Sequence, residues 1–270
     1  KYWFEKGYHD KFEIITFEGS FHGRSSAGIA ATASEKMTKG FGPLLPGFLS
    51  INWNNHEAIK NSISDRTAAI LLEPIQGEGG IRVVPEQCLK GIREFCDENK
   101  ILLILDEVQC GVGRTGKLFA HEWAEIEPDI MMVAKGIGGG FPLGAVLAKE
   151  NAASGMTTGT HGSTYGGNPL GCSIGLKVMD IISNPNFLLD VNHKAKNFRA
   201  GLSELLNKNT SIFEEVRGKG LMLGLKCKVQ NIDVVNAGYS NKLLTVPAGD
   251  NVVRLFTPIT MSDKQIKKSS

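Results

Sequence analysis

The chain has 270 residues, 41% of them hydrophobic, and its 30 Lys and Arg residues against 28 Asp and Glu residues leave a formal net charge of +2. A chain of this length and apolar content can bury a large core, which predicts one large domain or two of ordinary size. The nearly balanced charge gives no reason to expect nucleic acid or an anionic membrane surface as a partner.

The cysteines and the apolar runs exclude further classes of protein. Five cysteines, an odd number, are spread from Cys88 to Cys227 without a C-x-x-C pair, which argues against a disulfide framework or a zinc site. No apolar run approaches the roughly 18 residues of a membrane-spanning helix, and residue 1 does not open a signal peptide. We therefore expect a cytoplasmic protein without a membrane partner.

Both ends of the sequence look like interrupted elements. Residues 1–7 begin without Met on what looks like the last turns of a helix closed by Gly7. Residues 262–265 have the form of a capping box, but only five residues follow them. We therefore expect the chain to begin inside a domain and to stop slightly early.

The first 150 residues alternate apolar strands with helical segments. Residues 85–98 have helical spacing, with Leu89, Ile92, Phe95 and Cys96 on one face. Such alternation predicts an α/β fold with a mostly parallel sheet covered by helices. The strands are expected at residues 12–17, 68–73, 101–106, 130–134 and 144–148.

The last third of the chain changes in character. A helical pattern runs from Pro169 to about Asn207 and is broken at Asn184 and Pro185. We place a domain boundary near Ser183, which gives a large domain over residues 1–183 and a small C-terminal α+β domain over residues 184–270. Short strands of the small domain are expected at residues 212–216, 221–227, 243–247 and 252–256.

Two predicted strands deliver an ionisable residue to their carboxyl ends, where open α/β sheets bind ligands. Asp106 ends one apolar run and Lys135 directly follows another. An acid that keeps a pyridinium nitrogen protonated and a lysine that carries an aldehyde as a Schiff base are the groups that pyridoxal 5'-phosphate (PLP) chemistry requires. The glycines at 136–140 follow Lys135 and precede Phe141, which fits neither a Walker loop nor a dinucleotide site.

For other residues the sequence permits either a structural or a ligand-binding role. Phe21, on the loop after the first strand, lies either in the core or on the face of a cofactor ring. Arg24 and Arg254 are candidate carboxylate-binding groups, because a planar guanidinium can donate two hydrogen bonds to one carboxylate. The histidines show no metal-ligand spacing, so we expect no metal.

Four motifs together resemble those of the class III, or ornithine-type, aminotransferases, and most of all the acetylornithine aminotransferases among them. The resemblance runs from about Trp3 to Ile266. It implies PLP fold type I, PLP as cofactor and a homodimer with shared active sites. The motifs are residues 72–78 (LEPIQGE), 105–116 (LDEVQCGVGRTG), 134–142 (AKGIGGGFP) and 161–169 (HGSTYGGNP).

The resemblance also implies a role for each candidate residue. Lys135 would bind the cofactor and move a proton during catalysis, and Asp106 would keep the ring nitrogen protonated. Arg24 would bind the carboxylate of acetylornithine. Arg254 would bind the α-carboxylate of glutamate or 2-oxoglutarate, and Glu78 would pair with Arg254 when the ω-amino substrate is bound. The remaining implied contacts are Phe21 on the ring, Gln109 at the phenolic oxygen, Glu107 and Val108 beside the cofactor, Ser163 near the substrate, and Thr164 at the cofactor phosphate of the neighbouring subunit.

The implied activity moves the terminal amino group of N2-acetyl-L-ornithine to 2-oxoglutarate by a ping-pong mechanism. Its products are N-acetyl-L-glutamate 5-semialdehyde and glutamate, as in arginine biosynthesis. Ornithine, succinyldiaminopimelate and 4-aminobutyrate remain alternative amino donors. A catalytically incomplete fragment is a further alternative, because the family carries a phosphate-binding turn before the position of Lys1.

Overall fold

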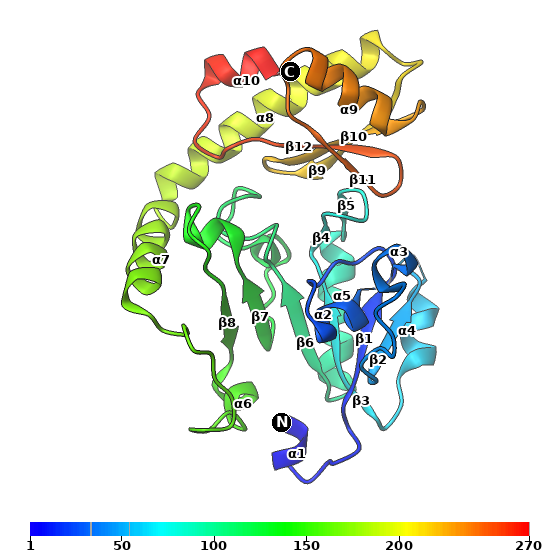
Figure 1. Ribbon diagram of the computed structural model, residues 1–270, viewed down its shortest axis with the longest axis vertical. Helices are drawn as coiled ribbons and strands as arrows, with labels where there is room; N and C mark the ends of the chain where they lie inside the picture. The colour runs from blue at the N-terminus through cyan, green and yellow to red at the C-terminus, as the bar shows by residue number, and fades with distance from the viewer. Residues whose placement is uncertain (33, 54, 270) are drawn as a thin grey trace.

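The computed structural model describes residues 1–32, 34–53 and 55–269. Figure 1 shows a larger part, which contains a six-stranded sheet, and a smaller part above it, which contains a four-stranded sheet. Helices α7 (Pro169–Ile182) and α8 (Pro185–Lys208) connect the two along one side (Figure 1). The fold thus has the expected α/β portion followed by a smaller α+β portion.

The larger sheet has the strand order β2-β1-β3-β6-β7-β8. All neighbours in it are parallel except β7 and β8, which are antiparallel. The five strands expected from the sequence are all present, and β2 is an additional edge strand. The bounds are β1 Glu13–Phe17, β2 Phe48–Ile51, β3 Thr67–Leu72, β6 Leu102–Asp106, β7 Ile130–Val133 and β8 Ala145–Ala148.

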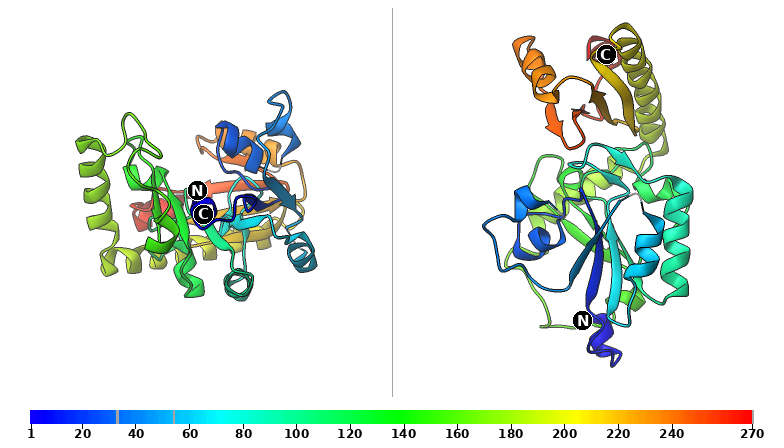
Figure 2. Two further views of the ribbon diagram at one scale, coloured as in Figure 1. Left: turned by 90° about the horizontal axis from the view of Figure 1, so that it is seen from below. Right: turned by 90° about the vertical axis from the view of Figure 1, so that its right-hand side faces the viewer.

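Helices cover both faces of this sheet. Figure 2 shows α4 (His56–Ser62) and α5 (Glu86–Glu98) on one face and α2 (Ser26–Ala31) on the other. Helix α5 buries Leu89, Ile92 and Cys96, as its spacing predicted. Every residue of β3 is buried, which explains its uninterrupted apolar sequence, because a central parallel strand packs on both of its faces.

The smaller part has an antiparallel sheet of order β11-β12-β10-β9 with its own apolar core. Phe198 and Leu202 of α8 are buried in this core beside Leu223 of the sheet. The expected strands are present with shifted ends, whereas helix α9 was not predicted. The bounds are β9 Phe213–Lys219, β10 Met222–Cys227, α9 Asn231–Ser240, β11 Val246–Ala248, β12 Val252–Phe256 and α10 Asp263–Ser269.

The break between α7 and α8 lies at Ser183 and Asn184. The Asn184 side chain accepts a hydrogen bond from the backbone N–H of Asn186, and Pro185 is the first residue of α8, a position that tolerates proline. The helix break therefore coincides with the boundary expected near Ser183; the division into two domains at that position stays a prediction.

The remaining elements are short. The turns expected at the two ends are present: Gly7, after α1, has a φ of 86°, and the Ser262 backbone N–H donates to Gln265 Oε1 at 2.9 Å. No helix among the described residues is long and apolar enough to cross a membrane. The short elements are α1 Tyr2–Glu5, α3 Glu35–Thr38, β4 Ile75–Gln76, β5 Arg82–Val83, the 3-10 helices η1 Ala120–Ala124 and η2 Lys135–Gly138, and α6 Glu150–Ala153.

Candidate active site

Two adjacent cavities lie at the carboxyl end of the larger sheet. The larger has a volume of about 420 Å³ and extends to β12 of the smaller part, and the other has a volume of about 190 Å³ and lies over the end of β6. Glu78, Gln109 and Lys135 line both. Because open α/β sheets bind ligands at this end, the two cavities together form the candidate active site.

Asp106 is held at the floor of the smaller cavity and is 6% exposed. Its Oδ2 lies 2.8 Å from His22 Nδ1, and its Oδ1 accepts a hydrogen bond from the Val108 backbone N–H at 3.0 Å. The Nε2 atom of His22 is buried and has no partner among the described residues. His22 was not predicted to be part of the site, because nothing in its local sequence points to a contact with a residue 84 positions away.

Lys135 follows β7 and is the first residue of η2. Its φ of 47° lies in the left-handed region, which is uncommon for a residue with a side chain and often occurs at functional sites. Its side chain borders both cavities, and no hydrogen bond or ion pair with another described residue is formed. The structure therefore presents a primary amine to the same space that Asp106 faces.

Gln109 lies over the backbone of Gly77. A Cβ atom at position 77 would lie 1.8 Å from Gln109 Oε1, so this packing requires glycine. The Gln109 Oε1 atom is buried and has no hydrogen-bond partner among the described residues. Gln109 thus offers the cavity a positioned amide whose hydrogen-bonding capacity is not used by the described residues.

Glu78 and Arg254 form an ion pair across the larger cavity. Arg254 Nη1 donates to Glu78 Oε1 at 2.6 Å and Nη2 donates to Oε2 at 3.1 Å. Arg254 is 9% exposed, while its Nε is buried without a partner in the described chain. Arg254 comes from β12 of the smaller part and Glu78 from the turn between β4 and β5, so the pair joins the two parts of the chain.

A second buried acid, Glu73, lies directly after β3 and lines the smaller cavity. Its Oε1 accepts the Phe21 backbone N–H at 2.9 Å, and its Oε2 accepts the Gly77 backbone N–H at 3.1 Å. Burial raises the pKa of Glu73 to about 7, and the nearby Asp106 contributes to the increase. Glu73 was not predicted to be a site residue, although an acid directly after a buried strand is a signal that could have identified it.

Most of the predicted residues meet here, but some do not. Phe21 and Val108 line the smaller cavity. Arg24 is exposed, with its guanidinium carbon 5.4 Å from the centre of the Phe21 ring. Ser163 and Thr164 lie on an exposed segment between α6 and α7 and line neither cavity.

Glu107, predicted to lie beside the cofactor, has a fully buried side chain that lines neither cavity. Its contact with the cofactor stays a prediction. Its carboxylate accepts hydrogen bonds from the backbone N–H groups of Ala120 and His121 at 2.6 and 2.8 Å, and its Oε1 lies 2.8 Å from His121 Nδ1. Because both oxygens are used in this way, Glu107 stabilises the start of η1.

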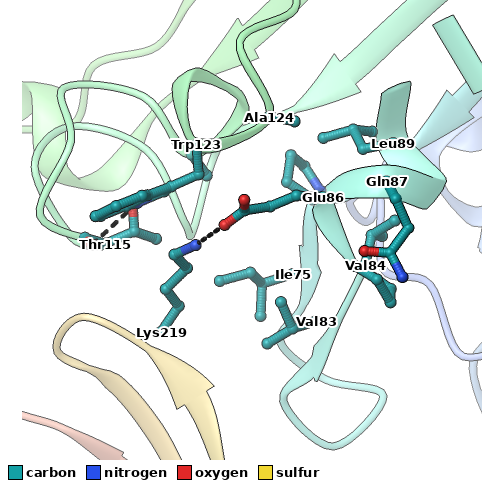
Figure 3. A pocket seen from close by; sticks show the side chains of 13 residues that line it. Ile75, Val83, Val84, Glu86, Gln87, Leu89, Thr115, Trp123, Ala124 and Lys219 are labelled. Atoms are coloured by element: carbon teal, nitrogen blue, oxygen red, sulfur yellow. Dashed lines mark hydrogen bonds and ion pairs between the residues drawn. The ribbon is translucent and has the colours of Figure 1, made fainter. Parts of the chain in front are cut away.

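A separate cavity of about 250 Å³, shown in Figure 3, lies between α5, η1 and β9. Its charged groups are already paired: Lys219 contacts Glu86 and lies 4.0 Å from the centre of the Trp123 ring. The Trp123 Nε1 donates to Thr115 (Figure 3). Because these groups satisfy one another, we assign the active site to the cavities at Asp106 and Lys135. Among the described residues, no group of three or more His, Cys, Asp or Glu side chains could hold a metal ion.

The family model and the most similar curated proteins match this chain over its whole length. The model of the class-III aminotransferase family matches residues 1–270. The acetylornithine aminotransferase of Rhodobacter capsulatus is 60% identical over 269 residues, and that of Mesorhizobium japonicum is 52% identical over 269 residues. Each alignment covers 100% of this chain and 68% or 67% of the relative, so this chain spans about two thirds of their length.

Solved structures of aminotransferases share the fold of this chain. The ornithine aminotransferase of Toxoplasma gondii superposes with a TM-score of 0.93 at 29% identity, covering 99% of this chain and 65% of that one. The N-acetylornithine aminotransferase of Stenotrophomonas maltophilia superposes with a TM-score of 0.83 at 33% identity, covering 99% and 66%. The expected PLP fold type I is confirmed by these matches.

Proposed function

The chain belongs to the class-III aminotransferase family, and on that basis we propose that it transfers the terminal amino group of N-acetylornithine to 2-oxoglutarate. The names of the two relatives at 60% and 52% identity support this choice of amino donor. The observation that carries the proposal is the grouping of Lys135, Asp106 and the Glu78–Arg254 pair around one continuous space.

The residues present fit PLP as the cofactor. PLP needs an acid at its ring nitrogen, an amine at its aldehyde and a hydrogen-bonding group at its phenolic oxygen. Asp106, Lys135 and Gln109 offer these groups, and the Gln109 amide, whose NH₂ can donate to the phenolic oxygen, forms no hydrogen bond with another described residue. Phe21 lines the same cavity and would contact the ring. When bound, PLP supplies an electron sink that stabilises negative charge on the substrate carbon.

The chain's own groups perform the remaining work of the reaction. Asp106 receives hydrogen bonds from His22 and from the Val108 backbone, which fix the orientation of its carboxylate. The Lys135 amine is a basic group available to move a proton, because it borders both cavities and forms no hydrogen bond or ion pair with another described residue.

Recognition of two different substrates uses the Glu78–Arg254 pair. With the pair closed, the charge of Arg254 is neutralised, which suits a substrate that brings an ω-ammonium group into this region. With the pair open, the guanidinium can bind the α-carboxylate of 2-oxoglutarate with two hydrogen bonds. Arg24, exposed beside Phe21, is the proposed contact for the carboxylate of acetylornithine.

The cofactor and donor assignments are tested on protein reconstituted with PLP. We expect an absorbance band of bound PLP that is lost in Lys135→Ala and kept in the control Lys90→Ala, which changes an exposed lysine of α5. Acetylornithine, ornithine, succinyldiaminopimelate and 4-aminobutyrate are then competed at equal concentrations. Absence of the band in the unsubstituted protein contradicts the cofactor assignment, and preference for another donor contradicts the substrate assignment.

We further propose a cytoplasmic homodimer in which Thr164 contacts the cofactor phosphate of the neighbouring subunit. The exposed position of Thr164, away from its own cavities, supports this arrangement. So do the exposed apolar side chains Leu170 and Leu176 of the adjacent helix α7. Among the described residues there is no disulfide bond, which suits a reducing compartment.

A mixing experiment tests the shared site. Lys135→Ala and Thr164→Asp variants, each inactive alone, are unfolded, mixed and refolded together. If Thr164 serves the partner's site, mixed dimers contain one site with neither substitution, and about a quarter to a half of the activity returns, as expected for closed two-fold assemblies. No recovery, or a monomer in sedimentation analysis, rules out the arrangement.

A further inference from the structure

Glu73 is a buried acid that the proposed reaction does not use. It is 5% exposed at the carboxyl end of the central strand β3, and in the described chain it forms no ion pair. A carboxylate in such a position loses its hydration and needs hydrogen-bond donors in exchange. The position of those donors indicates what the residue does.

Both donors are backbone N–H groups, and they come from two different loops of the site. We call residues 18–25, between β1 and α2, the Phe21 loop, and residues 77–81, between β4 and β5, the Glu78 loop. One Glu73 oxygen accepts the Phe21 N–H at 2.9 Å, and the other accepts the Gly77 N–H at 3.1 Å. Neither N–H has another acceptor among the described residues.

These loops carry most of the groups that define the site. The Phe21 loop bears the ring of Phe21 and the imidazole of His22 that contacts Asp106. The Glu78 loop bears the acid that pairs with Arg254, and its Gly77 lies under the amide of Gln109. A carboxylate that spans both loops therefore sets the distance between the ring-binding side and the carboxylate-binding side of the cavity.

We propose that Glu73 is a positioning residue whose two carboxylate oxygens clamp the Phe21 loop and the Glu78 loop together, so that the cofactor contacts and the Glu78–Arg254 pair keep one fixed geometry. The inference deepens the proposed function and rests on it for the meaning of the two loops. Glu73 is not assigned a proton-transfer step, because each of its oxygens already faces a backbone donor.

Two variants separate the clamp from a general contribution to stability. Glu73→Ala removes both acceptors. Glu73→Gln keeps the size of the side chain but has a single acceptor oxygen, so its NH₂ group must face one of the two backbone N–H groups. The matched control is Glu122→Gln, because Glu122 also accepts a backbone N–H, that of Phe119 at 3.2 Å, but lines neither cavity.

The measurement is amide hydrogen exchange of the PLP-free protein, resolved by peptide. At pH 8, where Glu73 is ionised, we expect exchange in residues 18–25 and 77–81 of Glu73→Ala to accelerate together by about tenfold or more, the usual effect of losing a hydrogen bond to a charged group. In Glu73→Gln at least one of the two segments should accelerate, and Glu122→Gln should change neither. Residues 222–227, in the buried strand β10, serve as an internal reference.

The outcomes are distinct. Acceleration of only one segment in Glu73→Ala overturns the clamp, as does unchanged exchange of both segments in either variant. If Glu73→Ala does not fold, Glu73→Gln decides alone: unchanged exchange overturns the proposal. In protein loaded with PLP, Glu73→Gln should also raise the PLP dissociation constant, which the control leaves unchanged. If the unsubstituted protein binds no PLP while the exchange result holds, the proposed function fails and the clamp stands.

Discussion

Replacing Glu78 by glutamine should strengthen the binding of 2-oxoglutarate. In the structure Glu78 occupies both terminal nitrogens of Arg254, so an incoming carboxylate must displace it. Opposite unit charges about 4 Å apart interact by about 4 kcal/mol at an effective dielectric constant of 20. The Glu78 side chain is 31% exposed, and its hydration when released offsets part of this energy.

A net value of about 1–3 kcal/mol for the pair corresponds to a factor of about 5–150 in a binding constant. When only a small fraction of the protein has the Glu78–Arg254 pair open, the apparent affinity for a ligand that needs the open state is reduced by that fraction. Removing the competing charge should therefore tighten 2-oxoglutarate binding by the same factor. The assay is a titration of PLP-loaded protein with 2-oxoglutarate, followed by the cofactor absorbance. The control is Glu86→Gln, which removes the acid paired with Lys219 in the separate cavity. An unchanged dissociation constant in Glu78→Gln, with Arg254 intact, would refute the competition.

Three further outcomes follow from the packing and the charges. Gly77→Ala should displace Gln109, whose Oε1 lies 1.8 Å from the added Cβ, and lower the free energy of unfolding by about 1–3 kcal/mol in urea titrations. The control Gly91→Ala, where helix α5 leaves open space for the added methyl group, should raise the free energy of unfolding by about 0.5–1 kcal/mol. The pKa of Glu73 rises from 4.5 to about 7 on folding, so the folded state binds the proton more tightly than the unfolded state. The free energy of unfolding should therefore fall by up to about 3 kcal/mol as the pH rises from 4.5 to 7. Urea titrations at pH 4.5 and pH 8 should show this fall in the unsubstituted protein and its absence in Glu73→Gln. Phe198→Ala, at a 1% exposed position in the core of the smaller part, should cost about 3–5 kcal/mol, and a loss below 1 kcal/mol would contradict the packing described.

The central strands of the larger sheet were predictable because their sequences are apolar. The run before Asp106 and the run before Lys135 contain only apolar residues, which are buried or partly buried, as expected of strands covered on both faces. Strand β8 is equally apolar, although its residues are exposed. The edge strand β2 was not predicted: it has four residues, and Leu49 and Ser50 are exposed. Pairing with β1 defines that strand, and pairing is a long-range property.

Helix α9 was missed for a related reason. Its sequence contains Asn, Val, Gly and Tyr, all weak helix formers, and it buries only Val235 fully. Its first residue is held by contacts that a local pattern does not contain, because the Asn231 side chain donates to the backbone oxygens of Ala248 and Val252, in the strands that α9 packs against. Tertiary contacts therefore determine this helix more than its own residues do.

The candidate site divides in the same way, into residues that a strand end predicts and residues that only the folded chain brings together. Asp106 and Lys135 belong to the first group. Glu107, which the resemblance places beside the cofactor, has a side chain that lines neither cavity. Its backbone N–H still bonds to Met132 O at 2.9 Å, so the ladder between β6 and β7 continues past Asp106. Successive side chains of a strand point to opposite faces, and since Asp106 faces the cavity, Glu107 must face away from it.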